Sequence, residues 1–122
     1  MKILLDTNFL LIPSQFNIDI FTEIDRIMPE KYTLYILDKS VQELKHISTN
    51  PKQSLKNRRA AKLGLQLLKA KKVKVLKKKG KSVDDILASI KEYIIATQDI
   101  VLKRRIKGKK IILRAKKKLV FA

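Results

Sequence analysis

The chain has 122 residues, of which 45% are hydrophobic, so its length and core content fit a single domain over residues 1–122. It has no cysteine and one histidine, which excludes disulfide bonds, thiolate metal sites and a multi-histidine zinc site, and which favours the cytoplasm. The net charge of +18 favours a polyanionic partner, with nucleic acid ahead of an anionic membrane surface.

The net positive charge comes from the second part of the chain. Residues 1–50 carry 5 basic and 7 acidic residues, whereas residues 51–122 carry 24 basic and 4 acidic residues. A surface that is merely rich in lysine, as in many thermophiles, would balance lysine with glutamate. No apolar segment approaches the roughly 20 residues needed to cross a bilayer, and Asp6 interrupts the first apolar run, so we expect neither a membrane span nor a secretory signal.

Strands are predicted where short apolar runs rich in β-branched and aromatic residues are bounded by polar residues. In chain order these runs are residues 2–5, 32–37, 73–76, 93–97 and 110–115, and the tail over 114–122 is either a last strand or a loose end. Segments with helical spacing lie between them, beginning with the apolar stripe over 20–28. Alternating strands and helices predict an α/β sandwich around a mainly parallel sheet.

Several helix ends are predicted from local signals. Asn50 followed by Pro51 predicts a helix over 51–70. Capping boxes are predicted at Ser40 with Glu43 and at Ser82 with Asp85. Gly108 is predicted to end the helix that carries VLKRRIK.

Acidic residues follow the predicted strands. Asp6 follows the first strand, Glu43 lies in the helix after the second, Asp84 and Asp85 open the helix after the third, and Asp99 follows the fourth. The carboxyl ends of parallel strands lie at one edge of a sheet, where ligand sites form. We therefore expect these carboxylates to converge.

Converging carboxylates repel one another unless a cation lies among them. Oxygen ligands select hard cations, so the expected cofactor is Mg²⁺ or Mn²⁺, and the expected chemistry is metal-assisted phosphodiester hydrolysis. Each acid also has a structural explanation. Glu43 and Asp85 would close capping boxes, Asp84 and Asp99 would complement helix dipoles, and Asp6 would cap a turn in which Thr7 and Asn8 bond the backbone.

Four motifs, in order and at suitable separations, resemble the PIN-domain ribonucleases. They are LLDTN (4–8), SVQEL (40–44), VDDIL (83–87) and ATQDIVLKRRI (96–106). The resemblance implies a three-layer α/β/α sandwich with a central parallel sheet and Mg²⁺- or Mn²⁺-dependent cleavage of RNA. It also implies that Asp6, Glu43, Asp84 and Asp99 are the catalytic, metal-binding acids, supported by Asn8, Asp85 and Thr97.

Within that family, the segment 96–114 looks more like the branch related to ribosomal-RNA-processing endonucleases than like VapC toxins, which need an antitoxin. The first would act on a ribosomal precursor. Dimers are common in the family, so a homodimer is a further expectation. Two alternatives stay open, namely a non-catalytic RNA-binding module and a phosphoacceptor receiver domain, although the latter expects two acids where LLDTN has one.

The candidates for RNA binding are basic residues on the helix after Pro51 and basic residues beside Asp99. They are Arg58, Arg59, Lys62, Lys103, Arg104 and Arg105. Contacts of this kind reach phosphates, so they give salt-dependent affinity without base specificity. The lysines at 77–79 and 116–118 are equally well explained as a solvated surface.

Overall fold

The fold is built on one six-stranded sheet, described by a computed structural model of residues 1–122. The strand order is β3-β2-β1-β4-β5-β6, with β6 antiparallel to β5 and all other neighbours parallel. The strands are β1 (Lys2–Leu5), β2 (Thr33–Leu37), β3 (Lys74–Leu76), β4 (Ile94–Ala96), β5 (Lys110–Arg114) and β6 (Lys118–Phe121). The predicted mainly parallel sheet is confirmed, and the tail forms its last strand.

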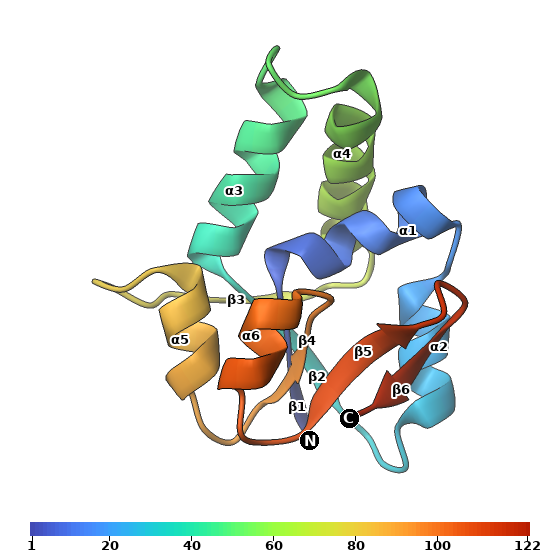
Figure 1. Cartoon of the computed structure of the whole chain (residues 1–122), viewed down its shortest axis with the longest axis vertical. Coiled ribbons are helices and arrows are strands. Elements are labelled where there is room, and N and C mark those ends of the chain that lie inside the picture. Colours follow the sequence, from blue (N-terminus) through green and yellow to red (C-terminus); the bar gives the residue numbers. More distant parts are fainter.

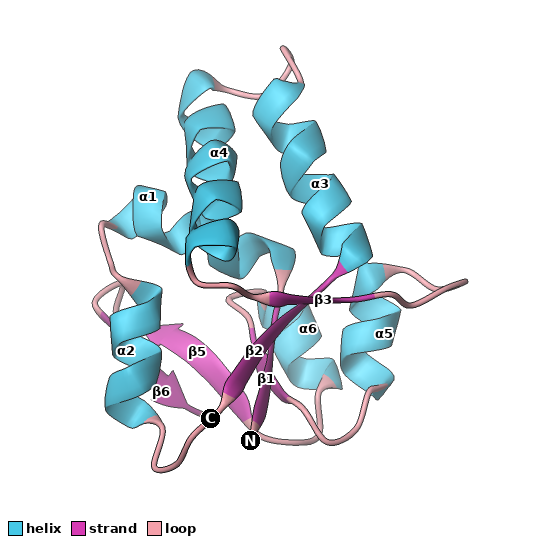
Figure 2. Ribbon diagram, turned by 180° about the vertical axis from the view of Figure 1, so that it is seen from behind, coloured by secondary structure: helices cyan, strands magenta, loops and turns pink.

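Helices join the strands and cover both faces of the sheet (Figures 1 and 2). They are the 3-10 helix η1 (Thr7–Leu11) and the α-helices α1 (Ile12–Phe16), α2 (Ile20–Ile27), α3 (Asp38–Thr49), α4 (Leu55–Ala70), α5 (Val83–Ser89) and α6 (Ile100–Arg105). The predicted α/β/α sandwich is therefore confirmed.

Alternation along the central strands divides the core into two layers, because successive side chains of a strand point to opposite faces. On β1, Ile3 and Leu5 belong to a large core with α2, α3 and α4. Leu4, between them, belongs to a smaller core with α5 and α6. Both faces of β1 are buried, which explains why its sequence is a continuous apolar run rather than an alternating one.

A topological switch point lies beside β1. The chain moves from β1 to β2 and β3 on one side and then returns to β4 on the other side. Leu5 pairs with Ala96, and the backbone N–H of Asp6 donates to the carbonyl of Ala96 at 2.8 Å. The residues that follow β1 and β4 are therefore neighbours, at the place where open α/β sheets form ligand crevices.

Helices α3 and α4 form an antiparallel pair that projects beyond the carboxyl ends of the strands (Figure 1). Helix α4 packs very closely on η1 at Gly64, where a Cβ would lie 2.8 Å from the backbone oxygen of Leu10. A side chain at position 64 would therefore separate α4 from η1. At 16 residues α4 is the longest helix, and none of the helices combines the length and apolarity that a membrane crossing requires.

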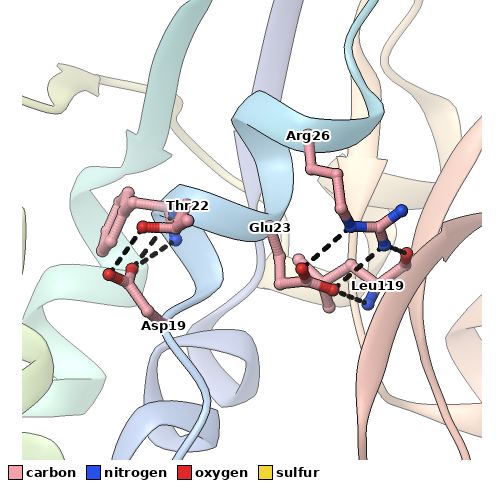
Figure 3. A network of polar contacts seen from close by, with 6 residues as sticks. Asp19, Thr22, Glu23, Arg26 and Leu119 are labelled. Atoms are coloured by element: carbon pink, nitrogen blue, oxygen red, sulfur yellow. Dashed lines mark hydrogen bonds and ion pairs between the residues drawn. The ribbon is translucent and has the colours of Figure 1, made fainter.

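A polar network fastens α2 to the last strand (Figure 3). Asp19 caps α2 by accepting hydrogen bonds from the backbone N–H groups of Phe21 and Thr22, both at 3.1 Å. Glu23 accepts from the backbone N–H of Leu119 at 3.0 Å, and Arg26 donates to the carbonyl of Leu119 at 2.8 Å. These bonds join α2 to β6, and antiparallel pairing of β6 with β5 makes the tail a strand rather than a loose end.

Three of the predicted helix signals are wrong. The predicted helix over 51–70 begins at Leu55, with Ser54 as its cap, because residues 51–53 form the turn between α3 and α4. Helix α3 begins at Asp38, directly after β2, so Ser40 lies inside the helix and caps nothing. Helix α6 ends at Arg105, and Gly108 has no positive φ. The cap at Ser82 is confirmed, since its hydroxyl accepts from the backbone N–H of Asp85 at 3.2 Å.

Candidate functional site

The candidate site is centred on Asp6, at the carboxyl end of β1. Asp6 is only 4% exposed. Its Oδ1 accepts a hydrogen bond from the backbone N–H of Thr7 at 2.7 Å, and its Oδ2 accepts one from the hydroxyl of Thr97 at 2.7 Å. The carboxylate is therefore fixed in orientation by groups that follow β1 and β4. Each of its oxygens still has a second lone pair for a ligand.

Burial raises the pKa of Asp6 to about 6, although both hydrogen bonds act to lower it. The negative charges of Asp84 and Asp99 raise it further. These two carboxylates, which come from α5 and α6, are therefore close enough to Asp6 to disfavour its charged form. This repulsion agrees with the prediction that the acids converge at this edge of the sheet.

Asp99 and Asp6 both form hydrogen bonds with Thr97. The hydroxyl of Thr97 accepts from the backbone N–H of Asp99 at 3.1 Å while it donates to Asp6. Asp99 is half-buried and caps α6, because its Oδ1 accepts from the backbone N–H of Leu102 at 3.0 Å. Asp99 therefore caps α6, at the helix end whose dipole the sequence predicted it to complement, and its charge also raises the pKa of Asp6.

Glu43 approaches from α3. It is exposed, and its Oε1 accepts a hydrogen bond from the hydroxyl of Thr7 at 3.1 Å. The sequence predicted only backbone contacts for Thr7, so this side-chain contact was missed. No local pattern could have revealed it, because it joins residues 36 positions apart.

The adjacent acids Asp84 and Asp85 face different surroundings in the first turn of α5. Asp84 lines an open groove of about 600 Å³ together with Glu43, Lys39 and His46. Asp85 instead accepts a hydrogen bond from Arg105 at 2.7 Å in an exposed ion pair, which lowers the pKa of Asp85. Asp84 is thus brought to the other acids, while Asp85 lies on the side that faces the end of α6.

The acids do not form a complete metal-binding site. No three aspartate, glutamate or histidine side chains of the chain lie close enough together to hold one metal ion. Asn8 is exposed, and its contribution is its backbone oxygen, which accepts from the side chain of Gln98 at 2.8 Å. This bond ties the segment after β4 to η1 and so supports the shape of the edge.

The basic candidates divide into two groups that lie on different helices. Arg104 and Arg105 are exposed at the end of α6, beside Lys103, and with Lys81 and Lys107 they line a hollow of about 590 Å³ between α5 and α6. The other group is on α4, where Arg59 and Lys62 are exposed. Arg58 is half-buried on the same helix, and its Nε is buried without a hydrogen-bond partner.

Comparison with known proteins agrees with this fold. A family described as "PIN like domain" matches residues 3–116. A solved structure entitled "Structure of the PIN domain endonuclease Utp24" matches with a TM-score of 0.74 at 24% sequence identity, over 98% of this chain and 90% of that one. No curated protein matches significantly. At this identity the structural match shows a shared fold.

Proposed function

Because the chain belongs to the PIN-like domain family, we propose that it is a divalent-metal-dependent nuclease that cleaves phosphodiester bonds of RNA. The active site would consist of Asp6, Glu43, Asp84 and Asp99, all in one domain that spans residues 1–122. The observation that supports this best is the buried Asp6, whose pKa is raised to about 6 by burial and by Asp84 and Asp99. A cation would relieve that repulsion.

The donor atoms fit Mg²⁺ or Mn²⁺. Asp6 and Asp99 offer carboxylate oxygens, and Thr97 ties the two residues together by donating to Asp6 Oδ2 and accepting from the backbone N–H of Asp99. Hard cations prefer carboxylate oxygens. Mg²⁺ is usually held by one or two carboxylates together with waters and substrate phosphates, so a group of three carboxylates is not required. When bound, the cation supplies positive charge beside the scissile phosphate and lowers the pKa of a water.

The protein's own contribution is to orient the acids before a ligand arrives. Thr97 fixes Asp6 Oδ2 and the backbone N–H of Asp99, and the backbone of Thr7 fixes Asp6 Oδ1. These bonds arise from the ends of two central strands, which are rigid elements. Glu43 and Asp84 line the groove beside this pair, where they would hold water or a second cation.

Exposed basic residues would hold the RNA backbone. Lys103 and Arg104 lie on the helix that Asp99 caps, and Arg59 and Lys62 lie on the projecting pair of helices. Arg105 would join them only by leaving Asp85, which costs little because an exposed ion pair contributes little to stability. Affinity from such contacts should fall steeply with salt.

The biological role follows from the resemblance of residues 96–114, which favours processing of a ribosomal RNA precursor over a toxin that an antitoxin controls. A second candidate function is a module that binds RNA without cleaving it. The observation that favours this second candidate is the lack of three acids grouped closely enough for one metal ion.

Cleavage of end-labelled single-stranded RNA tests the proposal. We expect cleavage with Mn²⁺ or Mg²⁺, loss of cleavage with a chelator, and loss in Asp99→Asn. Asp19→Asn is the matched control, because it changes an acid of the α2 network instead (Figure 3). Equal cleavage by wild type and Asp99→Asn would refute the site, and salt-sensitive RNA binding without any cleavage would support the second candidate.

A further inference from the structure

The side chain of Thr7 lies between two of the acids. Thr7 is 4% exposed, and it follows Asp6 at the end of β1. Its backbone N–H donates to Asp6 Oδ1 at 2.7 Å, and its hydroxyl donates to Glu43 Oε1 at 3.1 Å. One buried residue therefore contacts a carboxylate from the sheet and a carboxylate from α3.

Glu43 has greater freedom than Asp6. Asp6 is buried and held at both oxygens, whereas Glu43 is exposed on a helix of the pair that projects beyond the sheet (Figure 1). A free glutamate side chain has several rotatable bonds, so fixing it costs conformational entropy. A hydrogen bond from a buried threonine, whose β-branched side chain has few rotamers, limits that freedom in advance.

We propose that Thr7 is a positioning residue, which fixes Glu43 relative to Asp6 so that both can serve the same bound cation or its waters. The inference rests on the proposed nuclease function. The hydroxyl acts through Glu43, and the backbone N–H of Thr7 acts on Asp6 whatever side chain is present. Substitution of the side chain therefore tests the link to Glu43 alone.

The chain offers a matched control for the loss of a threonine hydroxyl. Thr22 donates its hydroxyl to Asp19 Oδ2 at 2.7 Å, so it too bonds a carboxylate (Figure 3). That pair is exposed at the start of α2 and belongs to no group of converging acids. Loss of the hydroxyl at Thr22 should affect α2 and leave cation binding unchanged.

The experiment is titration of the metal-free protein with Mn²⁺, in the absence of RNA, with free Mn²⁺ followed by electron paramagnetic resonance. Thr7→Val keeps the shape of the side chain and removes the hydroxyl, and we expect it to weaken Mn²⁺ binding about tenfold, as loss of an outer partner of a metal ligand commonly does. Thr7→Ser keeps the hydroxyl and should stay within about twofold of wild type. Thr22→Val should bind like wild type.

The same titration in a Glu43→Ala background separates positioning from general support of the fold. If Thr7 acts through Glu43, Thr7→Val adds no further loss there; an equal loss in both backgrounds overturns the inference. If Thr7→Val does not fold, Thr7→Ala serves as a second variant that lacks the hydroxyl. Wild-type affinity for Mn²⁺ in either folded variant also overturns the inference. If wild type binds Mn²⁺ and Thr7→Val binds it equally well, only this inference is refuted. If wild type binds no Mn²⁺, the proposed function is refuted as well.

Discussion

Two groups of acids in this protein have opposite surroundings. In the α2 network, Asp19 accepts three hydrogen bonds from the backbone and hydroxyl of Thr22 and the backbone of Phe21, and Glu23 accepts from Arg26 and the backbone of Leu119 (Figure 3). These hydrogen bonds lower the pKa of both acids. At the edge of the sheet, burial and neighbouring acids raise the pKa of Asp6 to about 6.

The difference separates acids whose charged forms the chain itself stabilises from acids whose charged forms the proposed cation would stabilise. Hydrogen bonds and an arginine stabilise the charged forms of Asp19 and Glu23 within the chain itself. Asp6 has two hydrogen bonds, yet they do not outweigh its burial and the charges nearby. A strongly perturbed carboxylate in such surroundings is a functional-site candidate on physical grounds.

Exchange of one carboxylate for an amide should give the largest contrast between the two regions. Asp6→Asn removes a charge and an oxygen that would bind the proposed metal, so we expect Mn²⁺-dependent RNA cleavage to fall by more than about 100-fold, beyond the loss typical of outer partners of a metal. Asp19→Asn should leave the cleavage rate within about twofold of wild type. Single-turnover cleavage rates check this, and equal losses in the two variants would contradict the division.

The pH dependence of stability should also distinguish the two regions. The folded pKa of Asp6 is about 6, above its ordinary value of 3.8, so the folded state binds more protons than the unfolded state between these values. The stabilisation from protonated Asp6 is present below about pH 4 and is lost as pH rises through about 6, by up to about 3 kcal/mol. Asp19 and Glu23 act in the opposite sense, since their lowered pKa values give stability that is lost towards acid pH.

Urea denaturation of the metal-free protein between pH 4.5 and pH 8 measures the contribution of Asp6, because the contributions of Asp19 and Glu23 change only at more acid pH. Asp6→Asn should have a larger free energy of unfolding than wild type at pH 8. The free energy of unfolding of wild type should decline as pH rises to 8, whereas that of Asp6→Asn should not. Added Mn²⁺ should restore stability to wild type at pH 8, because a ligand of the folded state stabilises it. An Asp6→Asn variant that is less stable than wild type at pH 8 would show that the carboxylate is held favourably in its charged form.

The packing under the site should be sensitive to added volume at Gly64. Gly64→Ala would place a Cβ 2.8 Å from the backbone oxygen of Leu10, so α4 or η1 must shift, at a cost of about 1–3 kcal/mol. Because η1 begins at Thr7, we also expect weaker Mn²⁺ binding. Thermal unfolding and Mn²⁺ titration of this variant check both effects, and Gly108→Ala is the control because a Cβ there meets nothing.

Loss of the α2 cap should give the smallest effect. Asp19→Ala removes the acceptor for two backbone N–H groups at the start of α2, so the free energy of unfolding should fall by about 1 kcal/mol. Mn²⁺ affinity should be unchanged, since the network lies apart from the edge acids. A loss of Mn²⁺ affinity that matches the loss for Asp6→Asn would show that the two regions are not independent.

The amino-acid sequence by itself determined the strands and the places of the acids along the chain. Runs such as residues 2–5 and 93–97 are apolar, β-branched and flanked by polar residues, so their local pattern predicts β1 and β4 without knowledge of their neighbours. Parallel strands then put Asp6 and Asp99 at one edge. The excess of basic residues also follows from the sequence alone, since the net charge of the chain does not depend on packing.

Tertiary structure alone decided which groups are buried and which are paired. The burial of Asp6, the contact of Thr7 with Glu43, and the different partners of Asp84 and Asp85 all depend on segments distant in sequence. The helix start at Leu55 and the strand at the tail were likewise fixed by the turn after α3 and by pairing with β5. The physical reason is that a pKa, a cap or a hydrogen bond reflects the surroundings of a group in space, which local sequence patterns do not contain.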